Sequence, residues 1–217
     1  MNLINLIYPK RCLFCDELLN IDHQGTICDK CINKPIYIYG KLHGKAINMV
    51  EEVYCLYLYE KPVSDAILSL KFGNRPDKGV GFGILLAECI RINLPNLENV
   101  VPVAVPLGQK RKRERRYNQS DIIAARVARS LNIPYTRKIV ARIKETDAQS
   151  TLGKNDRIIN VSGCFKVDKP GCVLGKTVII IDDVITTGST LNELAGVLLN
   201  AGAKKIIGAV VATSETG

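Results

Sequence analysis

Residues 177–191 read TVIIIDDVITTGSTL, and this stretch decides the fold of the 217-residue chain. It begins with a run of β-branched side chains that ends in two adjacent carboxylates, Asp182 and Asp183. An apolar run without polar alternation is typical of a strand that is buried on both faces of a parallel sheet. A hydroxyl- and glycine-rich turn follows and opens an apolar helical segment. The stretch therefore predicts an α/β fold in which helices flank a parallel sheet.

The turn at residues 186–190 is the first candidate binding site. It follows a buried strand, so it faces the carboxyl end of the sheet, where open α/β folds bind their ligands. Free backbone N–H groups and the positive end of the next helix dipole predict that this turn binds phosphate. Its residues are Thr186, Thr187, Gly188, Ser189 and Thr190. The preceding carboxylates can accept hydrogen bonds from vicinal sugar hydroxyls, so the two features together predict a site for a phosphorylated ribose.

Each half of this pattern has another interpretation. A strand that ends in Asp-Asp also occurs in receiver domains, and a Thr/Gly/Ser cluster before a helix can be a simple helix cap. Together, at this spacing, residues 177–191 resemble the 5-phosphoribosyl 1-diphosphate (PRPP) motif of type I phosphoribosyltransferases. The resemblance implies that Asp182 and Asp183 are catalytic residues that hold the ribose hydroxyls, and that Mg2+ binds together with PRPP.

Two cysteine pairs near the N-terminus predict a metal site. Cys12-Leu-Phe-Cys15 and Cys28-Asp-Lys-Cys31 are separated by twelve residues, and four thiolates at this spacing can close tetrahedrally on one ion. Four soft ligands favour structural zinc, with an iron–sulfur cluster, a mononuclear iron site or a redox dithiol as alternatives. A segment this small cannot build its own core, so we expect the metal to supply its folding energy. We therefore expect a zinc-ribbon-like module at residues 1–45 and a phosphoribosyltransferase-like domain at residues 46–217.

The net charge of +9 indicates an anionic partner, which could be a nucleotide, a nucleic acid or a membrane surface. The first residues, MNLINLIYPKRC, lack the charged region and the long apolar core of a signal peptide. No stretch approaches the roughly 20 apolar residues that span a bilayer. We therefore expect a cytoplasmic protein without membrane insertion.

A basic run at residues 110–116 is the second candidate binding site. It contains six cations in seven positions, follows an expected strand at 99–105 and precedes an expected helix at 121–131. Clustered cations repel one another, which predicts an anionic ligand: a diphosphate or the backbone of DNA or RNA. A solvated basic face is the alternative. The candidate contacts are Arg113, Arg115, Arg116, Asn118 and Gln119, together with Lys71 from an earlier turn.

The remaining chain predicts alternating helices and strands. We expect helices at 62–71, 77–92 and 191–200, and strands at 135–143, 164–167 and 205–212. Pro102 predicts that the strand at 99–105 is irregular or near a sheet edge. Residues 144–160 are long, polar and glycine-containing, which predicts either a mobile hood over the site or a disordered loop. In a hood, Thr146, Gln149 and Arg157 would meet the ligand.

Taken in order, these pieces resemble the ComF family of competence proteins. The resemblance rests on the cysteine pairs, Leu70-Lys71-Phe72-Gly73, Val103-Ala104-Val105-Pro106-Leu107, Arg113-Glu114-Arg115-Arg116-Tyr117-Asn118-Gln119-Ser120, the PRPP-like motif, and Gln149, Leu152, Arg157 and Asn160. It implies a zinc finger followed by a type I phosphoribosyltransferase domain. It also implies a role in natural transformation, in which the protein handles single-stranded DNA beside a helicase-like partner. Where the family usually has Arg-Gly-Phe-Asn-Gln, this chain has Arg116 in place of the glycine, and we expect that cation to alter the diphosphate loop.

Three functional hypotheses follow. In the first, the protein assists DNA uptake and binds PRPP or a related ribose phosphate. In the second, it is an active Mg2+-dependent phosphoribosyltransferase whose acceptor the sequence does not indicate. In the third, the zinc module is an interaction scaffold and the ribose-phosphate site is vestigial.

Overall fold

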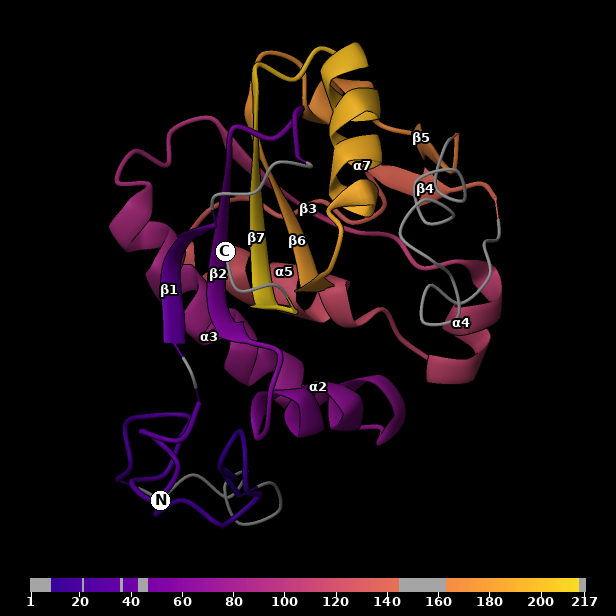
Figure 1. Ribbon diagram of the computed structural model, residues 1–217. Helices are drawn as coiled ribbons and strands as arrows, with labels where there is room; N and C mark the ends of the chain where they lie inside the picture. The colour runs from indigo at the N-terminus through magenta and orange to yellow at the C-terminus, as the bar shows by residue number, and fades with distance from the viewer. Residues whose placement is uncertain (1–8, 21, 36, 43–46, 145–162, 215–217) are drawn as a thin grey trace.

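The computed structural model describes residues 9–20, 22–35, 37–42, 47–144 and 163–214 (Figure 1). Three residues of the expected hood lie outside this part of the chain, namely Thr146, Gln149 and Arg157. Within the described residues, none of the helices is both long enough and apolar enough to cross a membrane.

A five-stranded sheet forms the centre of the molecule, in the order β1-β2-β7-β6-β3 (Figure 1). The strands are β1 (Tyr37–Leu42), β2 (Glu52–Leu58), β3 (Val100–Ala104), β6 (Thr177–Ile185) and β7 (Lys205–Thr213). Four of them run parallel, and β1 pairs antiparallel with β2 at one edge. The prediction of an α/β fold with a parallel sheet is therefore confirmed.

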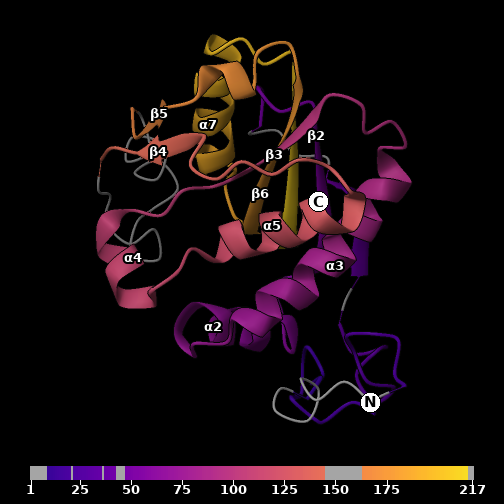
Figure 2. The same ribbon diagram turned by 180° about the vertical axis from the view of Figure 1, so that it is seen from behind.

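Helices cover both faces of this sheet (Figures 1 and 2). One face packs against α2 (Val63–Phe72), α3 (Pro76–Asn93) and α5 (Gln119–Leu131), and the other packs against α7 (Ser189–Asn200). A short helix, α4 (Gln109–Arg115), lies beyond the sheet edge, and a short 3-10 helix spans Pro170–Cys172. Each face of the sheet therefore has its own apolar core.

The strand predicted from residues 177–191 is β6, and it lies between β7 and β3. Residues 178–181 are fully buried, as expected for a strand covered on both faces. The strand is longer than its apolar run, because its pairing with β7 continues past Asp182 to Ile185. The two carboxylates therefore belong to the strand itself, which fixes their backbone.

The strand that contains Pro102 is β3, and it forms the edge of the main sheet opposite β1. Proline has no backbone N–H to donate, so it is tolerated in a strand whose one side is unpaired. The prediction of an edge position is therefore confirmed.

The expected strand at 135–143 is mostly wrong. Only β4 (Val140–Arg142) is extended, and it pairs antiparallel with β5 (Phe165–Val167) in a separate two-stranded sheet. The chain cannot stay extended before β4, because Lys138 has a left-handed backbone with φ 56°. This segment therefore stands beside β3 without continuing the main sheet.

The N-terminal edge strand β1 precedes the boundary that we expect between residues 45 and 46, yet it forms part of the main sheet. Gly40 lies opposite Cys55, and Leu42 lies opposite Val53. This pairing joins the zinc-binding segment to the rest of the fold through the backbone.

Candidate functional site

Two carboxylates near the carboxyl end of β6 form the centre of a site that we call the acidic site. Its residues are Asp182, Asp183, Ser120, Lys71 and Arg115. Ser120 Oγ and the backbone N–H of Asp183 each donate to Asp182 Oδ1 at 2.9 Å. Lys71 Nζ lies 3.1 Å from Asp183 Oδ2 and forms an ion pair with it. Segments far apart in the sequence thus meet at one pair of carboxylates.

Burial raises the pKa of Asp182 to about 7, and the neighbouring carboxylate of Asp183 adds to this shift. The hydrogen bond from Ser120 opposes the shift because it stabilises the charged form. Asp182 therefore exchanges its proton near neutral pH. Only the ionised carboxylate is purely an acceptor for ligand hydroxyls.

Arg115 reaches the acidic site from α4. Burial lowers the pKa of its guanidinium, even though the carboxylates of Asp183 and Asp182 oppose the shift. The guanidinium carbon lies 4.9 Å from the ring centre of Phe72, in a cation–π contact. One buried polar atom here, Arg115 Nε, has no hydrogen-bond partner among the described residues, whereas Asp183 Oδ2 has the ion pair with Lys71. Such atoms are rare in folded proteins and indicate a ligand or water at this place.

The turn at residues 186–190 follows β6 directly and leads into α7. Gly188 has a left-handed backbone with φ 76°, and a Cβ added there would lie 2.7 Å from Cγ1 of Ile47. Glycine is therefore required on two grounds. The hydroxyl oxygens of Thr187 and Ser189 lie 2.9 Å apart. The first turn of α7, which is fully described, carries no acidic side chain, and its capping residue has no side chain to satisfy the first N–H groups. This geometry suits an anion.

The basic run forms the helix α4, where the sequence predicts a loop. Gln, Lys, Arg and Glu are good helix formers, and α4 is made almost entirely of them. The helix ends at Arg116, which has a left-handed backbone with φ 64° and donates its N–H to Lys112 O at 3.0 Å. This is the position that glycine usually occupies at a helix end, which explains the glycine expected there from the family pattern.

The helix divides the basic run between two places. Arg115 lies at the acidic site, whereas Arg113 and Arg116 line a separate cavity. Arg113 belongs to α4 and Arg116 follows its last residue; both side chains line the cavity, and Arg115 does not. The run is therefore not one continuous anion-binding surface.

The side chain of Asn118 is half-buried and lines this cavity, whereas that of Gln119 is buried. Asn118 Nδ2 donates to Val105 O at 2.9 Å, and its Oδ1 accepts from the Ser120 N–H at 3.1 Å, so it caps α5 and ties it to β3. Gln119 is 3% exposed, and its Oε1 has no hydrogen-bond partner among the described residues. The sequence predicts that both are phosphate contacts; the geometry shows in addition that Asn118 caps α5.

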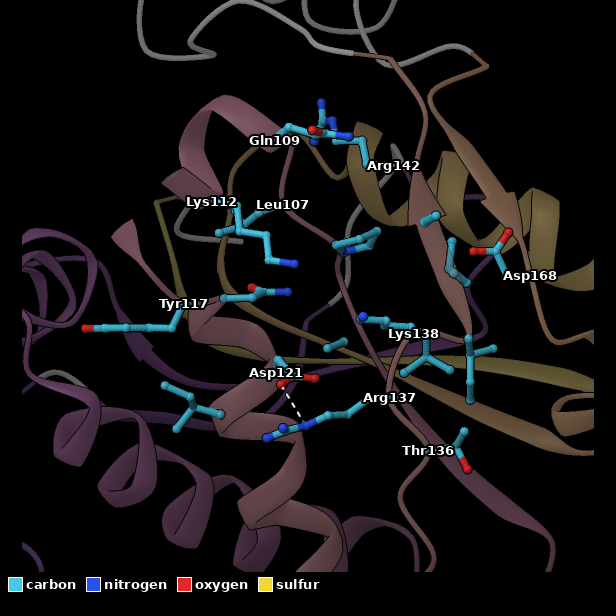
Figure 3. A pocket seen from close by; sticks show the side chains of 18 of the residues that line it. Leu107, Gln109, Lys112, Tyr117, Asp121, Thr136, Arg137, Lys138, Arg142 and Asp168 are labelled. Carbon is cyan, nitrogen blue, oxygen red and sulfur yellow. Dashed lines mark ion pairs between the residues drawn. The ribbon is translucent and has the colours of Figure 1, made fainter. Parts of the chain in front are cut away.

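The cavity beside β3 has a volume of about 810 Å³, and we call it the basic cavity (Figure 3). One wall consists of α4 and the start of α5, and the facing wall consists of residues 135–142. Val103 and Ala104, at the end of β3, also line it. The cavity exists because residues 135–142 do not pair with β3 as a further strand.

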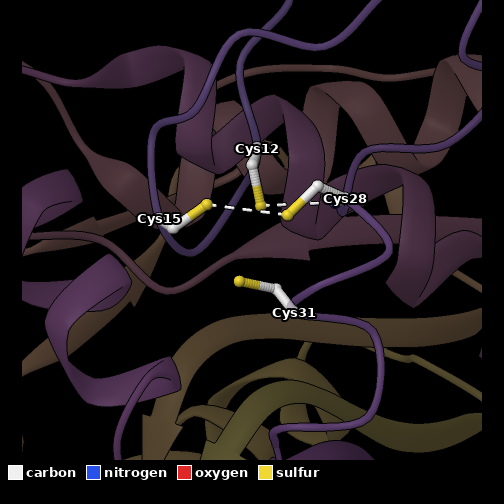
Figure 4. Close-up of side chains that lie close together, drawn as sticks. All are labelled: Cys12, Cys15, Cys28 and Cys31. Carbon is white, nitrogen blue, oxygen red and sulfur yellow. Dashed lines mark hydrogen bonds between the residues drawn. The ribbon is translucent and has the colours of Figure 1, made fainter.

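The four cysteines fit a zinc ion. Their sulfur atoms all lie within 4.8 Å of one another and point toward a common centre (Figure 4). Cys15 Sγ and Cys28 Sγ are 3.6 Å apart, close to the roughly 3.8 Å expected for two thiolates on one tetrahedral zinc. Burial alone would raise the pKa of Cys12, but backbone hydrogen bonds from Cys15 and Cys28 lower it to about 7. A lowered pKa favours the thiolate that a metal requires, whereas burial raises the pKa of Cys28 and raises that of Cys31 to about 12.

The zinc-binding segment is not isolated, contrary to our expectation from its length. Phe14 packs edge-on against Tyr57 and Phe82, with ring centres 5.9 Å and 6.5 Å away. Lys78, which is 2% exposed, donates to Leu13 O at 2.8 Å and to Asp16 Oδ1 at 2.7 Å. The turn between Cys12 and Cys15 therefore shares the core of the main sheet, and packing adds to whatever stability the metal provides.

Three features of these sites are not among those predicted from the sequence. Ser120 had a usable signal, because it precedes Ile123, Ala124 and Val127 at helical spacing and so faces the sheet. The Lys78–Asp16 contact joins residues 62 positions apart, and no local sequence pattern predicts it. The position of Lys138 on the basic cavity depends on a left-handed backbone that favours glycine, asparagine or aspartate in most proteins.

Two family models match the chain. The phosphoribosyl transferase domain matches residues 119–217, and the double zinc ribbon domain matches residues 3–42. The second match and the four-cysteine cluster agree on structural zinc. The chain therefore combines a phosphoribosyltransferase domain with an N-terminal zinc ribbon.

Several known proteins are similar to this chain. The purine phosphoribosyltransferase structure from Pyrococcus horikoshii Ot3 matches with a TM-score of 0.37 and 22% identity, covering 62% of this chain and 73% of that one. The DNA utilization protein YhgH of Escherichia coli is 30% identical over 85% of this chain and 76% of that protein. Competence protein F of Haemophilus influenzae is 30% identical over 95% of this chain and 96% of that protein. Because this last alignment spans nearly both chains, the protein belongs to the ComF family.

Proposed function

We propose that this ComF-family protein assists DNA uptake in natural transformation by handling single-stranded DNA in the cytoplasm. The observation that carries the proposal is the similarity to competence protein F over 96% of that protein's length. The net charge of +9 supports an anionic partner of this kind. A helicase-like competence partner, which the family resemblance implies, is part of the same proposal.

We further propose that the acidic site and the turn after it bind PRPP or a related ribose phosphate. Asp182 and Asp183 would accept hydrogen bonds from the ribose hydroxyls, and residues 186–190 would bind the 5′-phosphate at the start of α7. Arg115 would meet a second anionic group, because its buried Nε has no hydrogen-bond partner among the described residues. Buried polar atoms of both charges beside one phosphate-binding turn suit a ligand that has hydroxyls and phosphates.

Mg2+ would accompany PRPP at the acidic site. The carboxylates of Asp182 and Asp183 are hard oxygen ligands of the kind that this ion prefers. The ion would neutralise diphosphate charge when it is bound. The protein's own residues would orient the ribose. The turn at Gly188 would hold the 5′-phosphate, and Arg115 would hold the second anionic group at the other end of the ligand.

Isothermal titration calorimetry with PRPP and Mg2+ tests the ribose-phosphate site. The variant Asp182→Asn/Asp183→Asn is expected to weaken binding by at least about tenfold, because two charged acceptors are lost. Asp65→Asn is the matched control, since its carboxylate is 54% exposed on α2 and lies outside the site. Equal affinities in the wild-type protein and the double variant would contradict the proposed site. Release of diphosphate from bound PRPP would extend the proposal to catalysis.

Fluorescence anisotropy with a labelled oligothymidylate tests the DNA-handling part separately. The wild-type protein is expected to bind, and its affinity is expected to fall steeply with salt because phosphate contacts release counterions. A wild-type protein that shows no affinity at low salt would contradict this part while leaving the ribose-phosphate site untouched.

A further inference from the structure

The basic cavity carries a large excess of positive charge. Six lysine and arginine side chains line it: Lys112, Arg113, Arg116, Arg137, Lys138 and Arg142. Two aspartates also line it, and one of them is already paired. Asp121 accepts a hydrogen bond from Tyr135 OH at 2.6 Å, and its other oxygen lies 3.1 Å from Arg137 Nε (Figure 3). Among the described residues that line the cavity, the five other cations therefore outnumber the one other aspartate, Asp168.

Two of these cations face each other. In Figure 3 the ammonium groups of Lys112 and Lys138 point toward one another from opposite walls of the cavity. Like charges that converge on one cavity repel, even where solvent screens part of the repulsion. An anion between the two walls would turn this repulsion into attraction.

The backbone of this cavity is strained at two of its cations. Arg116 has φ 64° and Lys138 has φ 56°, and both side chains line the cavity. A left-handed backbone costs free energy for any residue with a Cβ, and glycine avoids this cost. Strained positions of this kind cluster at binding sites, where the side chain is needed in that place. Two strained cations on facing walls of one cavity indicate that both side chains have a binding role.

We propose that the basic cavity binds phosphates of single-stranded DNA, as a site separate from the acidic site. This inference rests on the proposed DNA-handling function and assigns it a surface. The volume lies within the range of about 300–1,000 Å³ that is usual for ligand pockets. Along one wall in Figure 3, Arg142, Lys138 and Arg137 follow one another, and Lys112 stands opposite. Cations in succession match the repeating charges of a strand better than a single phosphate.

The experiment compares two double variants with the same change in charge. Lys112→Glu/Lys138→Glu reverses the two facing cations, and Lys166→Glu/Lys204→Glu reverses two exposed lysines that do not line the cavity. Anisotropy with labelled oligothymidylate is measured over a series of salt concentrations. The cavity variant is expected to bind more weakly, and the slope of log affinity against log salt is expected to shrink by about 1.4, at roughly 0.7 for each lost phosphate contact. The control variant is expected to keep the larger slope.

Equal slopes in the two variants would overturn the assignment of the cavity, while binding by the wild-type protein would leave the proposed function standing. If the wild-type protein does not bind the oligothymidylate, both the function and the cavity assignment fall. Calorimetry with PRPP and Mg2+ on the cavity variant reports whether the acidic site is intact. Circular dichroism shows whether the variant is folded.

Glycine substitutions give a second and independent test. Arg116→Gly and Lys138→Gly are each expected to raise the urea midpoint of unfolding, because they relieve the left-handed strain, and at the same time to weaken DNA binding. Lys138→Ala, which keeps a Cβ, is expected to weaken DNA binding without raising the midpoint. A glycine variant that is more stable and binds DNA as well as the wild type would overturn the proposal.

Discussion

The acidic site and the basic cavity lie close together in the fold, yet they handle charge in opposite ways. At the acidic site the carboxylate of Asp183 is 4% exposed, and Lys71 and Arg115 stand beside it. In the basic cavity Lys112 and Lys138 are exposed and face one another. A buried charge must be paired because desolvation costs several kcal/mol, whereas solvent screens charges in an open cavity. The buried carboxylate of the acidic site therefore has cations beside it within the fold, whereas the exposed cations of the basic cavity can contact a ligand.

The short helix α4 separates these two regions. Arg115 contributes to the acidic site, and Arg113 contributes to the basic cavity, although the two are separated by one residue. A run of cations in a sequence therefore does not define one surface. The substitutions below are expected to affect one region and spare the other.

Lys71→Met is expected to have the largest effect. It leaves the carboxylate of Asp183 buried beside Asp182 without its ammonium partner, which we expect to lower the free energy of unfolding by about 3 kcal/mol near pH 8. Urea unfolding measures the change. Lys71→Met/Asp183→Asn is expected to recover most of the loss, because it removes the unpaired charge as well. A single variant as stable as the double variant would show that the ion pair does not matter.

The pH dependence of stability is expected to identify Asp182. Its folded-state pKa of about 7 lies above its unfolded value near 3.9, so the folded state holds its proton longer. Below about pH 4 the carboxyl group of Asp182 therefore does not lower the free energy of unfolding. Above that pH, the free energy of unfolding falls as the pH rises toward about pH 7. Relative to Asp182→Asn, the wild-type protein is expected to lose about 1.4 kcal/mol between about pH 6 and about pH 8.

Urea unfolding of both proteins across this range is the measurement. Parallel pH profiles for the wild-type protein and Asp182→Asn would contradict the raised pKa.

Ser120→Ala is expected to lower the free energy of unfolding by about 1 kcal/mol near pH 8, because Asp182 loses a hydrogen bond in a buried place. The same change is expected to raise the pKa of Asp182 further, since the donor that favours its charged form is gone. Ser130→Ala, near the other end of α5, serves as the control. An unchanged pH profile in Ser120→Ala would show that Ser120 does not tune the acidic site.

Arg113→Gln and Arg115→Gln are expected to have the smallest effects of these substitutions. Each is expected to weaken binding of one ligand, DNA or PRPP, and to leave the other unchanged. Arg113→Gln is expected to reduce the salt slope of oligothymidylate binding by about 0.7 and to leave PRPP affinity unchanged. Arg115→Gln is expected to do the reverse. Equal effects of both variants on both ligands would show that the basic run acts as one surface.

Part of this molecule could be predicted from sequence because its signals are local. The apolar run before Asp182 predicts β6, and the burial of residues 178–181 confirms the reason. Pro102 predicts an edge strand, since a missing N–H is tolerable only at an unpaired edge. The spacing of the two cysteine pairs predicts the clustering of four thiols that the structure contains.

Other features cannot be predicted from the sequence, because they depend on backbone conformation and contacts that no local sequence pattern shows. The strand expected at 135–143 shrinks to three residues, because one left-handed residue interrupts an otherwise suitable apolar pattern. The zinc-binding segment looks isolated by length, but Phe14 and Leu13 face α3 and join the main core. Asn118 caps α5, a role that its place after the basic run does not reveal.

The sequence by itself determined that this chain has a buried parallel strand ending in two carboxylates, a glycine turn suited to an anion, and four clustered thiols. These follow from hydrophobic pattern and residue spacing, which act over a few neighbouring residues. Only the tertiary structure decided which cation serves which carboxylate, and which cations face an open cavity. Lys71 and Asp183 are 112 positions apart, so their meeting depends on how α2 packs against the end of β6. The charged residues are visible in the sequence, but tertiary packing decides which of them lie together.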